Sequence, residues 1–142
     1  MKGFTLIEIM LTLALFGVVA GITIPVHQSF QNKNDLDISA SILAQSMRRA
    51  KALSQASDFD TTWGVYVATS TIAVFQGANY TARDSSYDEV FEMVDSISVS
   101  GISEIVFAKF TGEPNTTGTT ILTSVNNDTK NIVINSKGMV QY

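Results

Sequence analysis

Cysteine is absent from this chain of 142 residues, and histidine occurs only once. Without cysteine the chain has no disulfide bond and no thiolate nucleophile, and a single histidine leaves too few ligands for a zinc site. Acidic residues outnumber basic ones by 13 to 9, which gives a formal net charge of −4. This balance argues against phosphate-dominated nucleic-acid binding by the whole chain, although a local basic patch is compatible with it. We therefore expect no metal ion and no cofactor.

Charge is almost absent from residues 4–24, where Glu8 is the single charged side chain. A helix of this length reaches roughly 30 Å, the thickness of the hydrocarbon core of a membrane. Lys2 precedes the run, so the positive-inside rule leaves the N-terminus in the cytoplasm and exports the rest of the chain. Because proline removes a backbone donor, Pro25 predicts a kink or a local unwinding where the apolar run ends.

A second helical pattern follows a polar patch and covers residues 36–57. Its apolar side chains recur at spacings of four, three, four and three residues, which is one face of a helix: Leu36, Ala40, Leu43, Met47 and Ala50. We predict one long helix over residues 4–56, or two nearly collinear ones. The first half is apolar all round, and the second half is amphipathic.

The composition changes near residue 60 to short β-rich runs with a period of two. We expect strands over 61–70 and 71–77 joined by a tight turn, a loop over 77–89, and short strands to residue 110. A loop over 111–118 and three closing strands follow. The fold class is therefore α+β, a long N-terminal helix packed on a C-terminal antiparallel β domain. Five aromatic side chains of this half are predicted to lie in the core: Trp63, Tyr66, Phe75, Phe91 and Phe107.

Glu8 is unexpected in an apolar anchor, because a carboxylate in hydrocarbon is costly and normally has a partner. After Lys2 the chain has no basic residue before Lys33, so we expect the cationic partner of Glu8 to come from another molecule. If the chain were cut after Gly3, Phe4 would gain a free ammonium group one helical turn from Glu8. A neighbouring subunit shifted by one turn could then place its Phe4 amine against this carboxylate.

The segment Lys2-Gly3-Phe4-Thr5-Leu6-Ile7-Glu8 resembles the class III signal of type IV pilins and type II secretion pseudopilins. The resemblance implies cleavage between Gly3 and Phe4 by a prepilin peptidase, N-methylation of Phe4, and an apolar segment that is retained. It implies a structural subunit whose partners are other pilin or pseudopilin subunits, an inner-membrane assembly platform and membrane lipid. Gly17 and Pro25 match the residues that bracket a helix stretch which loosens in assembled pili.

The resemblance divides the chain into four parts. Residues 1–3 are a leader, 4–25 a transmembrane and assembly helix, 26–57 an amphipathic helix continuing into the globular domain, and 58–142 that β-rich domain. The implied location is the cytoplasmic membrane, with a single pass, and then a periplasmic or extracellular filament.

Beyond Pro25 the chain is similar to H-type minor pseudopilins and related minor pilins, in which a Trp-Gly pair opens the first strand. Trp63-Gly64 fits that position. DNA-binding members of the group use arginines late in the chain, where this sequence has Lys137-Gly138-Met139. The alternative function is a DNA-binding minor pilin of a DNA-uptake (competence) pilus. The absence of arginine at these positions argues against nucleic acid as a partner.

Two further groups of side chains are candidate sites. Asp84, Asp88 and Glu89 lie in the expected acidic loop, where a calcium site is conceivable but the spacing matches no EF-hand. A cluster of cations on the second helix half is expected to be solvated or paired with acids of the β domain: Arg48, Arg49 and Lys51. No nucleophile elbow or phosphate-binding glycine loop is present, so an enzyme is not expected.

Overall fold

The computed structural model describes residues 3–142, and of residues 22–27 and Asp58 it describes the backbone only. Its order is one long helix, a short 3₁₀ turn and eight strands: α1 (Leu6–Ala56), η1 (Asp58–Asp60), β1 (Trp63–Val67), β2 (Thr71–Gln76), β3 (Asp84–Glu92), β4 (Ser98–Gly101), β5 (Glu104–Phe107), β6 (Gly118–Thr123), β7 (Thr129–Ile134) and β8 (Val140–Gln141). The predicted α+β architecture is confirmed.

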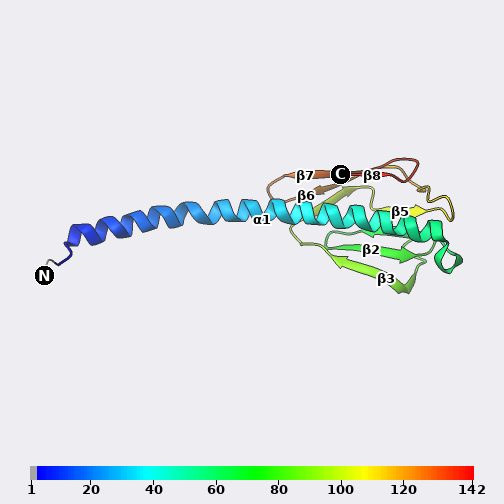
Figure 1. Ribbon diagram of the computed structural model, residues 1–142, viewed down its shortest axis with the longest axis horizontal. Coiled ribbons are helices and arrows are strands. Elements are labelled where there is room, and N and C mark those ends of the chain that lie inside the picture. The colour runs from blue at the N-terminus through cyan, green and yellow to red at the C-terminus, as the bar shows by residue number, and fades with distance from the viewer. Residues whose placement is uncertain (1–2) are drawn as a thin grey trace.

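Helix α1 is a gently curved rod whose first half projects from the domain and whose second half lies across both sheets (Figure 1). Its 51 residues span about 76 Å at 1.5 Å per residue. Ser57 ends it in the left-handed conformation, and its N–H reaches the carbonyls of Leu53 and Ser54, the usual way to satisfy the last turn. In the described part of the chain, no helix combines the length and apolar composition that crossing a membrane requires.

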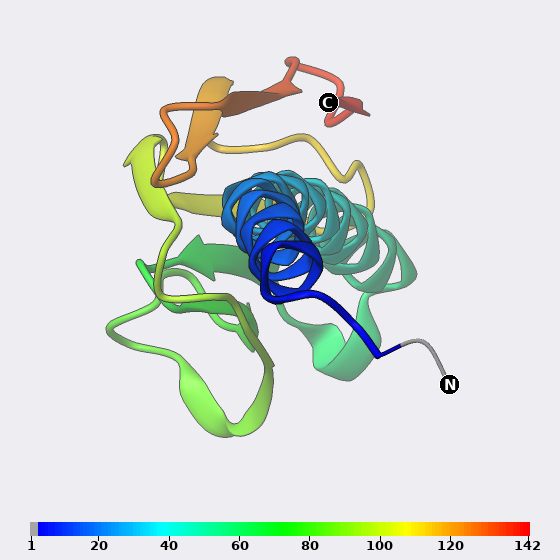
Figure 2. The ribbon, with the colours of Figure 1, turned by 90° about the vertical axis from the view of Figure 1, so that its left-hand side faces the viewer.

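The eight strands form two antiparallel sheets that together cover the buried face of the second half of α1. The first sheet has the order β3-β2-β1-β5, and the second has the order β4-β6-β7-β8. Figure 2, a view along the helix, shows β7 and β8 above α1 and the green strands β2 and β3 beside and below it. The chain crosses between sheets after β3, β4 and β5, so neighbouring strands are often distant in sequence.

The predicted apolar face of the helix is the centre of the core. Leu36, Ala40, Leu43, Met47 and Ala50 are each at most 2 % exposed, which confirms the spacing argument. The two sheets cover this face of the helix with apolar side chains from β1, β2, β5, β6 and β7. The main contributors are Trp63, Val65, Val67, Ile72, Val74, Ile105, Phe107, Leu122, Ile132 and Ile134.

The Trp63-Gly64 pair opens β1, and the two residues face opposite sides of the first sheet. The Trp63 side chain points into the core, and the backbone N–H of Trp63 donates to the buried Ser54 hydroxyl of α1 at 2.9 Å. Gly64 points to the outer face, where the Phe75 ring lies so close that a Cβ would sit 2.5 Å from it. Tryptophan and glycine are therefore each required by what lies on their own side of β1.

Two expectations about the β half are wrong. The loop expected over residues 77–89 ends early, because β3 begins at Asp84 and pairs with β2. Phe91, expected in the core, is 37 % exposed because it lies on β3, the edge strand of its sheet, beside an open cavity against α1. Trp63, Phe75 and Phe107 are buried as predicted, and Tyr66 is half-buried under a stacked Tyr80 ring, with centroids 4.0 Å apart.

Candidate functional site

The first part of α1 presents apolar side chains on every side and touches none of the strands. Ten large ones between Leu6 and Val19 are 51–77 % exposed: Leu6, Ile7, Ile9, Met10, Leu11, Leu13, Leu15, Phe16, Val18 and Val19. A contiguous apolar surface of this kind marks a contact with a membrane or with another protein. We call residues 4–21 of this surface the assembly segment.

Gly3 and Phe4 precede the helix in an extended stretch that an enzyme can reach. Phe4 is 82 % exposed, and nothing lies within 4 Å of a Cβ built on Gly3. The fold therefore does not require glycine at this position, and a requirement for it must come from a molecule that acts on this peptide bond. Met1 and Lys2, the rest of the expected leader, lie outside the described residues.

Glu8 makes its described contact within its own first turn. Its Oε2 atom accepts a hydrogen bond of 3.4 Å from the Thr5 N–H, and its own N–H donates to the Thr5 carbonyl at 3.1 Å. Thr-x-x-Glu at a helix start is the capping-box pattern, a signal that the sequence argument overlooked. In the described residues no cation pairs with Glu8. The carboxylate thus caps its helix weakly and stays exposed to a second partner.

Gly17 and Gly21 lie on the assembly segment with open space around them. Glycine inside a helix is less stable than alanine by about 1 kcal/mol, and neither residue has an atom within 4 Å of a built Cβ to explain it. Small residues let apolar helices approach closely. Close packing against a helix of another subunit would explain the two glycines, whereas no contact within this chain does.

The helix runs through Gly17 and Pro25 without interruption, so the local unwinding expected at Pro25 is absent from the isolated chain. The Pro25 side chain lies outside the described residues. Loosening of this stretch in an assembled filament stays a prediction.

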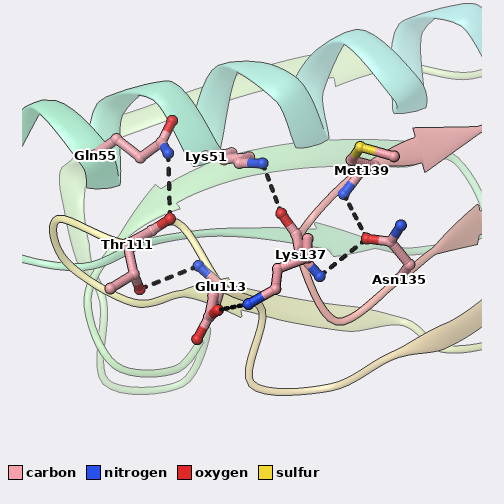
Figure 3. Close-up of polar contacts among 7 residues, drawn as sticks. All are labelled: Lys51, Gln55, Thr111, Glu113, Asn135, Lys137 and Met139. Carbon is pink, nitrogen blue, oxygen red and sulfur yellow. Dashed lines mark hydrogen bonds and ion pairs between the residues drawn. The ribbon is translucent and has the colours of Figure 1, made fainter.

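The far end of α1 is tied to the late Lys137-Gly138-Met139 turn, as Figure 3 shows. Lys51 donates from Nζ to the carbonyls of Lys137 at 2.7 Å and Gly138 at 3.3 Å. The Lys137 ammonium in turn donates to Glu113 at 2.7 Å. This hydrogen bond lowers the pKa of Glu113 and raises the pKa of Lys137. The cations at this turn are therefore engaged within the protein.

Arg48 and Arg49, the cations that precede Lys51 on α1, are also engaged. Arg49 forms a two-pronged ion pair with Glu89 of β3, which raises the pKa of Arg49. Arg48 donates to the Val140 carbonyl at 3.4 Å and lies 5.6 Å from the ring centroid of Tyr142. The expected pairing with acids of the β domain is thus seen for Arg49, whereas Arg48 and Lys51 bind carbonyls.

The acidic residues considered for calcium do not lie in a loop, which corrects the expectation. Asp84, Asp88 and Glu89 belong to β3, and the last two are ion-paired, Asp88 with Arg83 at 2.7 Å and Glu89 with Arg49. Alternation along the strand sends neighbouring carboxylates to opposite faces. Within the described residues no group of three or more acidic, histidine or cysteine side chains could hold a metal ion.

Comparisons with known proteins agree with the N-terminal segment. Residues 1–24 match the family model of the prokaryotic N-terminal methylation motif. Two curated proteins of Pseudomonas aeruginosa, each described as a fimbrial protein, are 27 % identical to the chain over 118 residues. That alignment covers 78 % of this chain and 77 % of each relative. No solved structure matches the chain.

Proposed function

We propose that this chain is a member of the type IV pilin family and a minor structural subunit of a type IV pilus or of a type II secretion pseudopilus. The observation that carries the proposal is the division of α1. One half is the core of a folded domain, and the other half exposes ten large apolar side chains that the domain does not cover. Packing the exposed halves of several copies together removes them from water and leaves the domains outside.

Maturation begins at the exposed Gly3–Phe4 bond. A prepilin peptidase, the partner that the family implies, cleaves it on the cytoplasmic side and Phe4 is N-methylated. Before assembly the apolar run of residues 4–24 holds the chain in the cytoplasmic membrane, with Lys2 inside and the β domain on the opposite side. The assembly platform and membrane lipid are the other partners at this stage.

Glu8 then sets the axial register between neighbouring subunits. Its present donor is the Thr5 N–H at 3.4 Å, a long hydrogen bond that a charged donor can outcompete. The new Phe4 ammonium of a neighbour, shifted by about one turn, is such a donor in surroundings without water. Gly17 and Gly21 allow the close approach of helices that this pairing needs. The similarity to H-type minor subunits favours a low-copy priming or tip position.

The DNA-binding alternative needs cations that are free to meet phosphates. Lys137, Lys51 and Arg49 are each held by a carboxylate or a carbonyl of the chain itself. Breaking these contacts offsets the gain from phosphate binding, which supports the structural proposal over this alternative.

Two substitutions of Glu8 test the register role. Glutamine can still accept the hydrogen bond from Thr5 but has no charge, and leucine has neither property. We expect both variants to reach the membrane and to be cleaved after Gly3, and both to be lost from filaments, as measured by immunoblotting of sheared filaments against membranes. Normal incorporation of Glu8→Gln would show that Glu8 acts only as a helix cap.

The intact mass of the native protein tests the proposal as a whole. We expect a chain that starts at methylated Phe4. A chain that retains Met1 would instead indicate an anchored binding module that does not polymerise.

A further inference from the structure

Strand β3 is an open edge of the first sheet. It pairs with β2 on one side, and no described strand lies on the other. Figure 1 places it at the margin of the domain. The Met93 N–H donates to the Ser70 carbonyl at 2.8 Å, and Phe91 lies opposite Ile72 in the same ladder. Backbone groups alternate in direction along an antiparallel strand, so the N–H and C=O groups of Val90 and Glu92 face the open side.

This edge is long for an unpaired strand. It has nine residues, against a usual five or six, and its exposed apolar residues lie at one end, where Val90 is 56 % exposed. Open edges pair with another strand unless they are covered, shortened, bulged or kept apart by charge, so a partner of opposite charge is the one that can pair here. One register shift between Val74 and Gln76 interrupts the ladder, and the stretch from Glu89 to Glu92 beyond it is regular.

A cavity of about 130 Å³ opens beside this regular stretch, between β3 and the exposed side of α1. Its lining combines two apolar side chains with three polar ones: Ile42, Gln45, Ser46, Arg49 and Phe91. An apolar cavity of about 150 Å³ binds benzene in another protein, so this one holds one aliphatic side chain. A strand added to the edge would place every second side chain on the face of the sheet that lines this cavity.

The charge of the edge selects the partner. β3 carries four carboxylates and no basic residue: Asp84, Asp88, Glu89 and Glu92. Asp88 and Glu89 have internal partners, whereas Asp84 and Glu92 form no ion pair within the described part of the chain. Cross-strand neighbours of opposite charge stabilise a pair of strands, and neighbours of like charge destabilise it.

We infer that β3 is a docking edge for an extended segment of a partner protein in which apolar side chains alternate with lysine or arginine. One apolar side chain enters the cavity beside Phe91, and the basic ones lie on the opposite face of the sheet, where they meet Glu92. The backbone of the segment pairs with Val90 and Glu92, as in other strand-addition complexes.

A second copy of the chain is a poor occupant of this edge. Two β3 strands paired about a two-fold axis would place carboxylates opposite carboxylates. They would also point the two α1 helices in opposite directions, whereas subunits of one filament point the same way. The second reason rests on the proposed function, and the first does not.

The test uses the full chain in a non-ionic detergent and a synthetic peptide, Lys-Val-Lys-Leu-Lys-Val-Lys, with the glutamate version Glu-Val-Glu-Leu-Glu-Val-Glu as control. Hydrogen exchange is followed residue by residue. The basic peptide should slow exchange of the Val90 and Glu92 amides, and the acidic peptide should not. No binding of the basic peptide at about 1 mM, or protection elsewhere only, would overturn the inference.

Val90→Pro is the sharpest variant, because it removes an N–H that faces the open edge and serves no bond to β2. Val90→Thr keeps this N–H and the β-branched shape, and is the matched control. We expect the proline variant to bind the basic peptide at least about tenfold more weakly and the threonine variant to change affinity less than about twofold. Equal affinities for the two variants would contradict the docking edge.

Glu92→Lys keeps the test decisive if proline disturbs the sheet, since this side chain is exposed. This substitution should lower the affinity for the basic peptide and make that affinity less dependent on salt concentration. An unchanged affinity would contradict the charge argument. If the wild-type chain associates with itself and Val90→Pro abolishes this association, the partner at β3 is a second copy of the chain, and the choice of a different protein is wrong. Cleavage after Gly3 and incorporation into filaments are measured on the same variants, so failure at β3 with normal maturation leaves the proposed function intact.

Discussion

Replacing Gly138 by alanine should detach the C-terminal turn from the end of α1. Gly138 has φ +66°, and a Cβ there would lie 2.6 Å from the Gly112 carbonyl oxygen and 3.3 Å from Lys51. The left-handed conformation costs alanine about 1–2 kcal/mol. The clash meets a backbone atom that cannot rotate away, so the overpacking adds about 1–3 kcal/mol. The expected loss in the free energy of unfolding is therefore about 2–5 kcal/mol.

This loss is a large part of a typical stability of about 5–15 kcal/mol, so it is measurable by urea unfolding. Trp63 is the single tryptophan and is 4 % exposed, so its fluorescence reports on the domain core in the full chain. At a urea m-value of about 2 kcal/mol/M, the urea midpoint should fall by about 1–2.5 M. Met139→Ala, a change of an exposed neighbour, should alter stability by less than about 0.5 kcal/mol. Equal midpoints for the two variants would refute the packing argument.

Three other expected outcomes follow from the same structure. Leu43→Ala removes a fully buried side chain between helix and sheets, and should lower the free energy of unfolding by about 2–5 kcal/mol in the same urea assay. Gly3→Leu should leave the urea midpoint unchanged and block cleavage, as seen by intact mass, because the fold places nothing against this residue. The stabilisation by Glu113–Lys137 should be full between the ordinary pKa values of the two groups, about 4.3 and 10.4. It should disappear as the pH falls through the lowered pKa of Glu113 or rises through the raised pKa of Lys137. A difference in unfolding free energy between wild type and Glu113→Gln that persists below the lowered pKa of Glu113 would contradict it.

The buried face of α1 could be predicted because it depends on local spacing. Helical geometry places Leu36, Ala40 and Leu43 on one side whatever covers them, and the structure supplies two sheets as the cover. The N-terminal motif could also be predicted, since its residues are close in sequence, and residues 1–24 match the family model of the N-terminal methylation motif. The roles of Gly3, Phe4 and Glu8 stay predictions.

Strand β3 could not be predicted because its first half has the composition of a turn. Serine and aspartate favour loops, and residues 84–89 become a strand through pairing with β2 and through ion pairs that join Arg83 and Arg49 to it. Arg49 is 40 residues away from Glu89 in the sequence, so no local sequence pattern predicts their contact. Phe91 was misplaced for the same reason, because burial in a sheet depends on strand order.

The docking of the last strand on the helix has a consequence for synthesis. Lys51 and Arg48 reach the backbone of residues 137–140 across 86 to 92 positions of sequence. At about 5–20 residues per second, the ribosome completes the helix roughly 5–20 s before it completes the strand that closes over it. During that interval the apolar stripe from Leu36 to Ala50 is uncovered on the growing chain. Folding of the domain is therefore a late event in synthesis, completed only when the final residues emerge.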